Sequence, residues 1–509
     1  MTFAWTKVEP VNTQLKGPHG VVNPYEDWEF ATRPDVDPQA AKPPERWQPV
    51  YIRLQGRPPY GNYARELLAA LRTRKIAIGT DVQEMLQDII RTNPGALPPP
   101  FFVFRPEYLA YTTDADGIVL PYEVIEVGPA IPLEYVDKTA RERTEYATGA
   151  APPTAVRGTE VVTAVIDDFI GIANERFRDG AGQTRFHKFW AQGMPILNGR
   201  GPANLPHPVI GNEWDKKEID AMLKGVSDEP DFYRKLFPNG LPFIPLAGRG
   251  KYPVNLYDPL FERPFSFAAT HGTHVADIAA GYPKGRAPGR SPIVAVQLPQ
   301  LATYETWGSR LDLFILLGVM RILYWADRWT EAKGRKVRAP VVINISYGVH
   351  AGPKDGTGFL ESEIAKLVSA RNAKGYPTAV VLPSGNAYRA QTHAHMMLKG
   401  TESQGLTLRV QPEDLSVSFT ELWLEDLDQA TLTIAPPVGP SQTFPLIAAA
   451  QVWNWQRTGS DGKPVTVGRL YVQPLDTGRT RIVFALCPTL NHGDPPHTAL
   501  PGAYGLTLR

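Results

Sequence analysis

The chain has 509 residues, with 53 Lys and Arg against 52 Asp and Glu, and this net charge of +1 excludes a global field that gathers nucleic acid or an anionic membrane. Hydrophobic residues make up 43% of the sequence, which excludes disorder throughout, and the length predicts about three domains. A single cysteine, Cys487, excludes an internal disulfide framework, and 50 prolines, about twice the ordinary share, indicate many loops and extended connections.

Residues 1–150 are predicted to form an amino-terminal arm and a small helical and β region. The first 60 residues or so are rich in Pro, Asp, Glu and Trp without a sustained period, which is typical of an extended arm. Residues 63–93 are predicted to be helical, and within them the capping-box spacing of Thr80 and Gln83 precedes apolar residues on one face, up to Asn93. The chain does not open with a basic stretch followed by an apolar core, so we expect a cytoplasmic protein, with an extracellular location left open.

Residues 151–398 are predicted to form an α/β domain with a doubly wound parallel sheet. Continuous apolar runs, typical of buried parallel strands, cover residues 161–166, 293–296, 341–345 and 379–382. Helical patterns lie between them, over residues 271–280, 311–332 and 360–374. The segment 185–190 is expected to belong to an elaborated rim or an added helical pair over the cleft. The longest apolar stretch, residues 313–320, is far shorter than the ~20 residues of a membrane span.

Residues 399–509 are predicted to form an antiparallel region resembling a β-sandwich. Apolar residues alternate with polar ones in short segments, and clusters of Pro, Gly and Asp separate these segments. The chain is therefore expected to be an α/β protein with an amino-terminal extension and a β-rich carboxyl-terminal region.

The first candidate site residue, Asp167, ends the first predicted strand of the parallel sheet. In doubly wound sheets, ligands bind at this edge, so a carboxylate here is well placed to orient a catalytic base. A turn or helix cap is the alternative role for an aspartate in this position. The next residue, Asp168, is expected to point to the other face of the strand.

The second candidate, His271, begins a helix of small residues with the string His-Gly-Thr-His-Val-Ala. Small residues allow this helix to approach the sheet closely, which sets the imidazole at a fixed distance from a strand-end carboxylate. His274 is predicted to pack within the same helix. The two histidines have neither the adjacent glutamate nor the spacing of a zinc-protease helix, so no metal site is predicted.

Ser384, Gly385 and Asn386 follow the fourth predicted strand. The glycine permits a sharp turn, and the Asn386 amide can donate a hydrogen bond to a developing oxyanion. A Gly-Asn turn without a catalytic role is the alternative.

Ser346, Tyr347 and Gly348 directly follow the third predicted strand. Exposed backbone at such a position can pair with an extended peptide by strand addition. Taken alone, this string carries little information about function.

Together, the four strings resemble those of the subtilisin-like serine proteases, the subtilases, over about residues 155–390. The resemblance implies a triad in which His271 accepts the proton of a serine nucleophile, Asp167 fixes the imidazole tautomer and Asn386 binds the oxyanion. It also implies a peptide or protein substrate, held by Ser346, Tyr347, Gly348, Ser384 and Gly385. No nucleic-acid partner and no cofactor are expected. Calcium is frequent in the family, but no loop here has a convincing calcium-ligand spacing.

The nucleophilic serine of that family is not found. The family's G-T-S-x-A motif does not occur after Asn386, and the nearest string, around Ser460, is predicted to be a hairpin turn. In one interpretation, residues 399–509 are a truncated jelly-roll-like insertion and the serine lies on a missing or separate carboxyl-terminal segment. In the other, the chain is a pseudoprotease or peptide-binding protein that retains the cleft.

A third interpretation, an α/β domain that binds a small ligand, would need a phosphate-binding glycine loop after the first strand, and none is found there. We therefore predict a serine-type endopeptidase of the subtilisin family. The 509-residue chain alone is expected to be inactive, because its Asp and His have no hydroxyl to activate.

Overall fold

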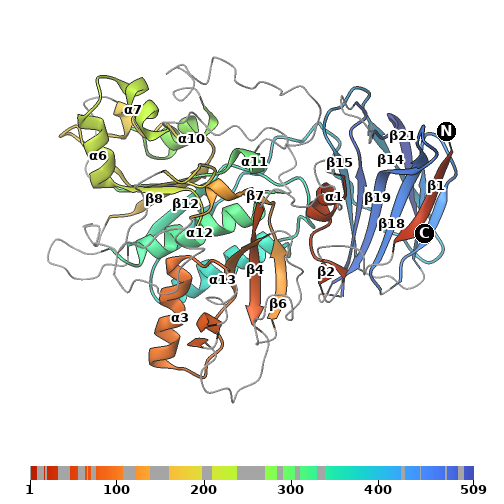
Figure 1. Cartoon of the computed structure of the whole chain (residues 1–509), viewed down its shortest axis with the longest axis horizontal. Helices are drawn as coiled ribbons and strands as arrows, with labels where there is room; N and C mark the ends of the chain where they lie inside the picture. Colours follow the sequence, from red (N-terminus) through yellow and green to blue (C-terminus); the bar gives the residue numbers. More distant parts are fainter. Residues whose placement is uncertain are drawn as a thin grey trace.

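The structure is a computed structural model, and it describes most of the chain. The described residues are 2–8, 16–17, 20–32, 46–54, 64–65, 67–69, 76–106, 122–137, 160–197, 209–237, 270–283, 291–303, 310–329, 339–425, 430–447, 449–475, 478–490 and 498–509. A helix-covered sheet lies at one end of the molecule and a pair of antiparallel sheets at the other (Figure 1).

The helix-covered sheet has six strands in the order β10-β9-β11-β8-β12-β13. These are β8 (Val162–Asp167), β9 (Phe186–Ala191), β10 (Asn212–Asp215), β11 (Ile293–Gln297), β12 (Val341–Ile345) and β13 (Thr378–Val381). All neighbouring strands are parallel except β10 and β9. The carboxyl ends of the parallel strands therefore lie at one edge of the sheet, where sites form in such folds.

Helices pack on both faces of this sheet. On one face, α12 (Asp312–Ala326) and α13 (Phe359–Ala373) share a hydrophobic cluster with Ala164 and Ile166 of β8. On the other, α6 (Lys216–Lys224), α7 (Glu229–Leu236) and α10 (His271–Ala280) share a cluster with Val165, because successive strand residues point to opposite faces. The structure thus confirms a mixed α/β protein with a largely parallel sheet, whereas the doubly wound arrangement of subtilisin type stays a prediction.

Two antiparallel sheets pack against each other through another hydrophobic cluster, with Tyr504 of one sheet against Trp455 of the other at a ring distance of 5.7 Å. One sheet has the order β1-β18-β19-β20-β15 and the other β14-β21-β16-β17. The strands are β1 (Phe3–Val8), β14 (Gln404–Val410), β15 (Ser418–Leu424), β16 (Thr431–Ala435), β17 (Gln442–Pro445), β18 (Gln451–Thr458), β19 (Pro464–Pro474), β20 (Thr480–Leu486) and β21 (Gly502–Leu508).

The amino-terminal residues are divided between two parts of the molecule. Strand β1 pairs with β18, and α1 (Pro24–Thr32) lies against β19 and β20 (Figure 1). In contrast, β4 (Arg46–Leu54) forms a separate sheet with β5 (Phe101–Pro106), β6 (Tyr122–Val127) and β7 (Ile131–Pro132), and α3 (Thr80–Thr92) shares the hydrophobic cluster on one side of it.

This separate sheet contacts the helices of the α/β part. The Tyr51 hydroxyl donates to Glu363 Oε2 of α13 at 3.0 Å. The predicted domain boundaries near residues 150 and 398 stay predictions. Within the first 32 residues, however, β1 and α1 belong to the part formed by the two antiparallel sheets, and β1 is an edge strand there.

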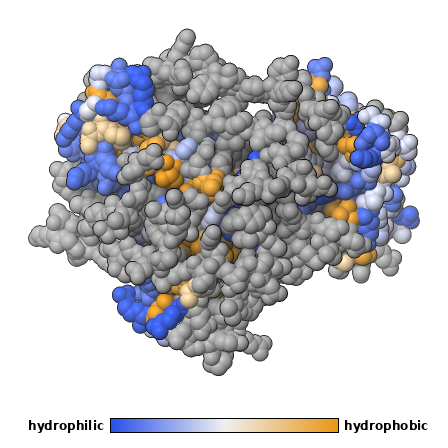
Figure 2. All heavy atoms as spheres, in the orientation of Figure 1, coloured by the Kyte–Doolittle hydropathy of each residue, from blue (hydrophilic) through white to orange (hydrophobic). Residues whose placement is uncertain are grey.

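In Figure 2, the described surface over α6 and α7 is mainly hydrophilic. Among the described residues, no helix has both the length and the apolar character needed to cross a membrane.

Candidate functional site

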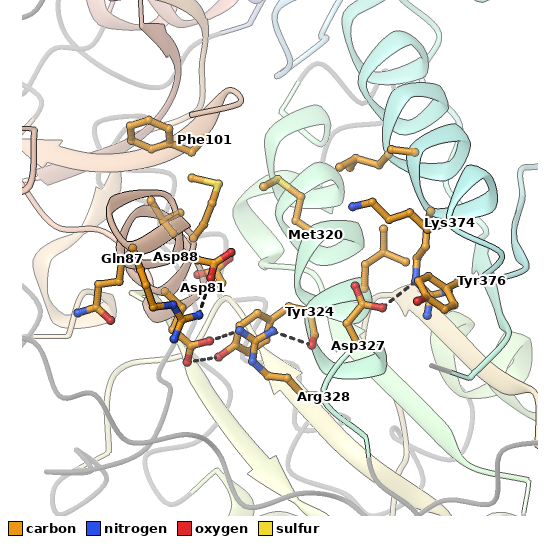
Figure 3. A pocket seen from close by; sticks show the side chains of 18 residues that line it. Asp81, Gln87, Asp88, Phe101, Met320, Tyr324, Asp327, Arg328, Lys374 and Tyr376 are labelled. Carbon is orange, nitrogen blue, oxygen red and sulfur yellow. Dashed lines mark hydrogen bonds and ion pairs between the residues drawn. The ribbon is translucent and has the colours of Figure 1, made fainter. Parts of the chain in front are cut away.

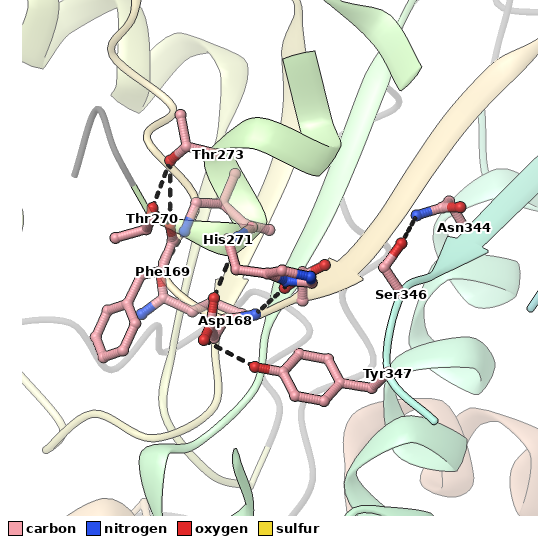
Figure 4. Close-up of polar contacts among 12 residues, drawn as sticks. Asp168, Phe169, Thr270, His271, Thr273, Asn344, Ser346 and Tyr347 are labelled. Carbon is pink, nitrogen blue, oxygen red and sulfur yellow. Dashed lines mark hydrogen bonds and ion pairs between the residues drawn. The ribbon is translucent and has the colours of Figure 1, made fainter. Parts of the chain in front are cut away.

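Asp167 and His271 meet at the carboxyl-terminal edge of the parallel sheet (Figure 4). Asp167 is the last residue of β8 and is fully buried, whereas His271 is the first residue of α10 and its side chain is 53% exposed. Nδ1 of His271 lies 2.8 Å from Oδ1 of Asp167, and the same oxygen accepts a hydrogen bond from the Asp168 amide at 2.8 Å. Nε2 of His271 has no hydrogen-bond partner among the described residues and is free to accept a proton.

Small and hydroxyl-bearing residues bring α10 this close to the end of β8. A Cβ at Gly272 would lie 1.7 Å from the Asp168 carbonyl oxygen, so only glycine fits there. The Thr273 hydroxyl accepts from the Gly171 amide at 2.7 Å and donates to the Phe169 carbonyl at 3.1 Å. Phe169 itself has a φ of +28°, an unusual conformation for a bulky residue. The turn after β8 is therefore held in a strained shape by the helix that carries His271.

Burial and charge set the protonation of the pair. Burial raises the pKa of Asp167 to about 6, although the hydrogen bond and charge of His271 oppose this shift. The second oxygen of Asp167, Oδ2, is buried without a hydrogen-bond partner among the described residues. For His271, desolvation lowers the pKa, but the hydrogen bond to Asp167 and the charges of Asp167 and Asp168 outweigh it, so the pKa lies above 6.5. The imidazole is thus a stronger base than a free histidine.

Asp168 is part of the same group, and the expectation that its side chain points away is wrong. Its Oδ1 accepts from the Gly272 amide at 3.1 Å, and its Oδ2 accepts from the Tyr347 hydroxyl at 2.7 Å (Figure 4). Strand alternation does not apply here, because β8 ends at Asp167 and the chain turns. Two consecutive aspartates at a strand end were the signal that could have identified this second carboxylate.

Tyr347 contacts the imidazole as well as Asp168. Its ring meets that of His271 edge to face, with centroids 5.6 Å apart. Burial and the charge of Asp168 raise the pKa of Tyr347 far above its usual value, so its hydroxyl remains a donor. In the same segment, Ser346 accepts a hydrogen bond from Asn344 at 2.8 Å, and Gly348 is exposed.

The segment with Ser384, Gly385 and Asn386 follows β13 and is exposed. Gly385 has a φ of +89°, the left-handed conformation that glycine adopts most readily. A Cβ at Gly348 would lie 3.9 Å from Pro383, so this segment lies beside residues 346–348. The three residues make no hydrogen bond to Asp167 or His271 in this structure.

Asp167, Asp168 and His271 each offer an atom within 4.8 Å of the others, which is close enough for a shared cation. However, the Asp167 oxygen that faces His271 and both Asp168 oxygens already accept hydrogen bonds from protein donors. His274 is exposed and is not a member of this group, so the prediction that it is a buried or packing residue of the same helix is wrong. We assign no metal to these residues, and the expectation that the chain needs no cofactor stays a prediction.

A pocket of about 950 Å³ lies between α3, α12 and α13 (Figure 3). Its apolar residues include Met85 and Met320, and an ion pair between Arg328 and Glu84 crosses it. None of the predicted site residues lines this pocket. No local sequence pattern indicates this pocket, because its walls come from segments far apart in the chain.

Comparisons with known proteins do not assign the chain to a family. No protein-family model matches it, and no curated protein matches it. Among solved structures, the CspB protease of Clostridium perfringens matches with a TM-score of 0.45 and 18% identity, over 69% of this chain and 59% of that protein. The chain thus spans less than two-thirds of the length of that protease.

The prediction that the chain is a subtilase with a jelly-roll-like insertion is therefore wrong: no family model matches, and the structural similarity is weak. The strings that suggested it each cover only a few residues around a strand end or a helix start. Such short strings specify only the local geometry of the backbone. A chain can share this geometry even when the rest of its sequence matches no family model. The CspB protease is thus only a weak structural neighbour, and its activity is not carried over to this chain.

Proposed function

We propose that Asp167 and His271 are the acid–base pair of a serine-type endopeptidase whose nucleophilic serine lies outside this chain. One observation carries the proposal: His271 is held at 2.8 Å by a buried carboxylate through Nδ1, while Nε2 has no hydrogen-bond partner among the described residues. This orientation is what a general base needs to take a proton from a nucleophile.

In this mechanism, Nε2 of His271 accepts the proton of a serine hydroxyl as its oxygen attacks the peptide carbonyl. Asp167 keeps the proton on Nδ1 and stabilises the imidazolium that forms. His271 then gives the proton to the leaving amine. Asn386, next to Gly385, would donate its side-chain amide to the oxyanion. Residues 346–348 would pair with the extended peptide.

A peptide-binding protein without catalytic activity is the second candidate. It is favoured by the absence of a serine hydroxyl at His271 within the described part of the chain. In that case, the same edge of the sheet binds an extended peptide and releases it uncleaved. Both candidates need the backbone of residues 346–348 to be accessible, and Gly348 is exposed.

The reading frame of the gene beyond Arg509 provides the test. We expect the 509-residue chain neither to cleave a fluorogenic protein substrate nor to react with a fluorophosphonate probe. A product extended beyond Arg509 should do both, and His271→Ala should abolish cleavage, whereas His274→Ala, on the same helix, should not. Asp167→Asn should lower kcat by about 10⁴-fold.

Two results would contradict the proposal. A stop codon directly after Arg509 would exclude a serine on a continuation of this chain, and stoichiometric fluorophosphonate labelling of the 509-residue chain would show that the nucleophile is already present. With the stop codon, binding of an unlabelled peptide that perturbs the NMR signals of His271 would favour the second candidate.

A further inference from the structure

Two carboxylates face the single imidazole of His271, yet only one is bonded to it. Oδ1 of Asp167 lies 2.8 Å from Nδ1, while Asp168 lies close enough for its oxygen to be within 4.8 Å of the other two groups. Both oxygens of Asp168 are already engaged, one by the Gly272 amide at 3.1 Å and one by the Tyr347 hydroxyl at 2.7 Å. The Gly272 amide and the Tyr347 hydroxyl therefore keep Asp168 from competing with Asp167 for the imidazole of His271.

The two donors differ in kind. The Gly272 amide belongs to the first turn of α10, so it moves only if His271 itself moves. The Tyr347 hydroxyl comes from another strand end, after β12, and its ring also rests edge-on against the imidazole at 5.6 Å. One side chain thus contacts both the base and the carboxylate that would compete for it.

We propose that Tyr347 is a positioning residue that holds Asp168 away from the imidazole and so reserves Nδ1 of His271 for Asp167. The inference rests on the proposed function, in which His271 must keep its proton on Nδ1 and its free electron pair on Nε2. Without the phenolic donor, Oδ2 of Asp168 can turn toward the ring and form a second ion pair with the imidazolium.

The consequence is a change in the basicity of His271. Among the described residues, the charged groups that act on it are Asp167 at the end of β8 and Asp168 in the following turn, and Tyr347 is the third titratable group in contact. Burial and the charge of Asp168 raise the pKa of Tyr347, so it does not lose its proton near neutral pH. The hydrogen bond from Tyr347 to Asp168 therefore stays formed throughout the pH range in which His271 titrates.

A double-mutant cycle read by NMR tests this role. The chain is labelled with ¹⁵N-histidine, and the signal of His271 among the 10 histidines is assigned with His271→Ala. In Tyr347→Phe, the pKa of His271 should rise by about 0.5–1 unit, because a nearby carboxylate favours the charged ring. In Asp168→Asn, it should fall, since a negative charge is lost. Adding Tyr347→Phe to Asp168→Asn should cause no further shift.

The non-additivity separates positioning from a merely structural role. If Tyr347 only packs against the ring, its loss shifts the pKa equally with aspartate or asparagine at position 168. An equal shift in both backgrounds, or no shift in Tyr347→Phe, would overturn the inference. Tyr388→Phe is the matched control, because Tyr388 is 98% exposed and should leave His271 unchanged.

The readout also separates this inference from the proposed function. The NMR cycle needs no hydrolysis, so it can succeed even where the extended protein cleaves nothing, and the proposed function alone then fails. If the extended protein cleaves peptides and Tyr347→Phe leaves both the pKa of His271 and the pH–rate profile unchanged, only the positioning role fails.

Discussion

Arg469 of β19 donates a hydrogen bond to Oδ2 of Asp27 in α1 at 2.7 Å, although 442 residues separate the two in sequence. The Tyr471 hydroxyl donates to the same oxygen at 2.8 Å. The side chains of Arg469 and Asp27 are only 10% and 4% exposed. This pair fixes the amino-terminal helix on the carboxyl-terminal sheet, next to the β1–β18 pairing. The first residues of the chain are thus a structural part of the β-rich region.

Asp27→Ala should destabilise the protein by about 3–5 kcal/mol, because it leaves the Arg469 guanidinium buried without its counter-charge. The measurement is urea unfolding followed by tryptophan fluorescence. Asp461→Ala is the control: Asp461 pairs with Lys463 at 3.8 Å on the surface, and its loss should cost at most about 1 kcal/mol. Equal costs for the two variants would show that α1 does not depend on this pair.

A second buried carboxylate connects β10 with α12. Glu213 accepts hydrogen bonds from Arg321 at 2.6 and 2.9 Å, from Lys188 at 3.0 Å and from Trp325 at 3.2 Å. Desolvation raises its pKa, but the charges of Arg321 and Lys188 outweigh this, so the pKa of Glu213 lies below 4.5. A lowered pKa in the folded state means that the stabilisation is present above pH 4.5 and is lost as the pH falls through the folded value.

Glu213→Gln should therefore reduce stability at pH 7 and flatten its decline on acidification. The glutamine keeps the shape of the side chain but removes the negative charge that Arg321 and Lys188 both contact, for which we expect a loss of about 3–5 kcal/mol at pH 7. Thermal unfolding at pH 7 and at a series of pH values below 4.5 measures both effects. Parallel pH profiles for the wild type and the variant would contradict this assignment.

The environment of Glu213 also explains why residues 186–191 form strand β9, although the sequence predicts a rim or an added helical pair there. Residues 186–191 contain His187 and Lys188, and such polar residues do not indicate a central strand. In β9, Lys188 is paired with Glu213, and burial together with the charges of Lys216 and Arg185 lowers the pKa of His187 to about 4, so that it remains neutral. The partner that makes this possible lies on another strand, and periodicity along one segment cannot detect it.

Local signals predicted other elements well. The apolar run that ends near Asp167 is β8, and the helix predicted to begin at His271 is α10, which begins at that residue. Both depend on neighbouring residues alone. The pairing of β1 with β18, and the contact of Tyr347 with Asp168, depend on chain topology and on the direction of single side chains. The Tyr347–Asp168 contact completes the candidate site, and no local pattern encodes either long-range contact.

Gly272→Ala should disturb the candidate site more than its size suggests. The new methyl group would collide with the Asp168 carbonyl, 1.7 Å away, so α10 must move from the end of β8. We expect a loss of about 1–3 kcal/mol in unfolding free energy and a fall in the pKa of His271 toward 6.5, because its distance from Asp167 increases. Gly180→Ala is the control, since a Cβ there meets no atom within 4 Å. An unchanged His271 pKa in Gly272→Ala would show that the helix tolerates the methyl group.

Asp167→Asn should weaken the base and, at high pH, stabilise the fold. Without the Asp167 carboxylate, the pKa of His271 falls, because only the charge of Asp168 still raises it. In the wild type, burial raises the pKa of Asp167 from 3.8 to about 6, and the pKa of His271 is raised above 6.5. A group whose pKa is higher in the folded than in the unfolded state stabilises the protein at pH values below its unfolded pKa. This stabilisation is lost as the pH rises through the folded pKa.

Asp167→Asn removes both contributions, so the difference in unfolding free energy, variant minus wild type, should become more positive by about 1–3 kcal/mol between pH 4 and pH 8. Urea unfolding across this range measures it. A functional site is often maintained at a cost to stability. A difference that stays constant with pH would show that the buried Asp167 carboxylate carries no such cost.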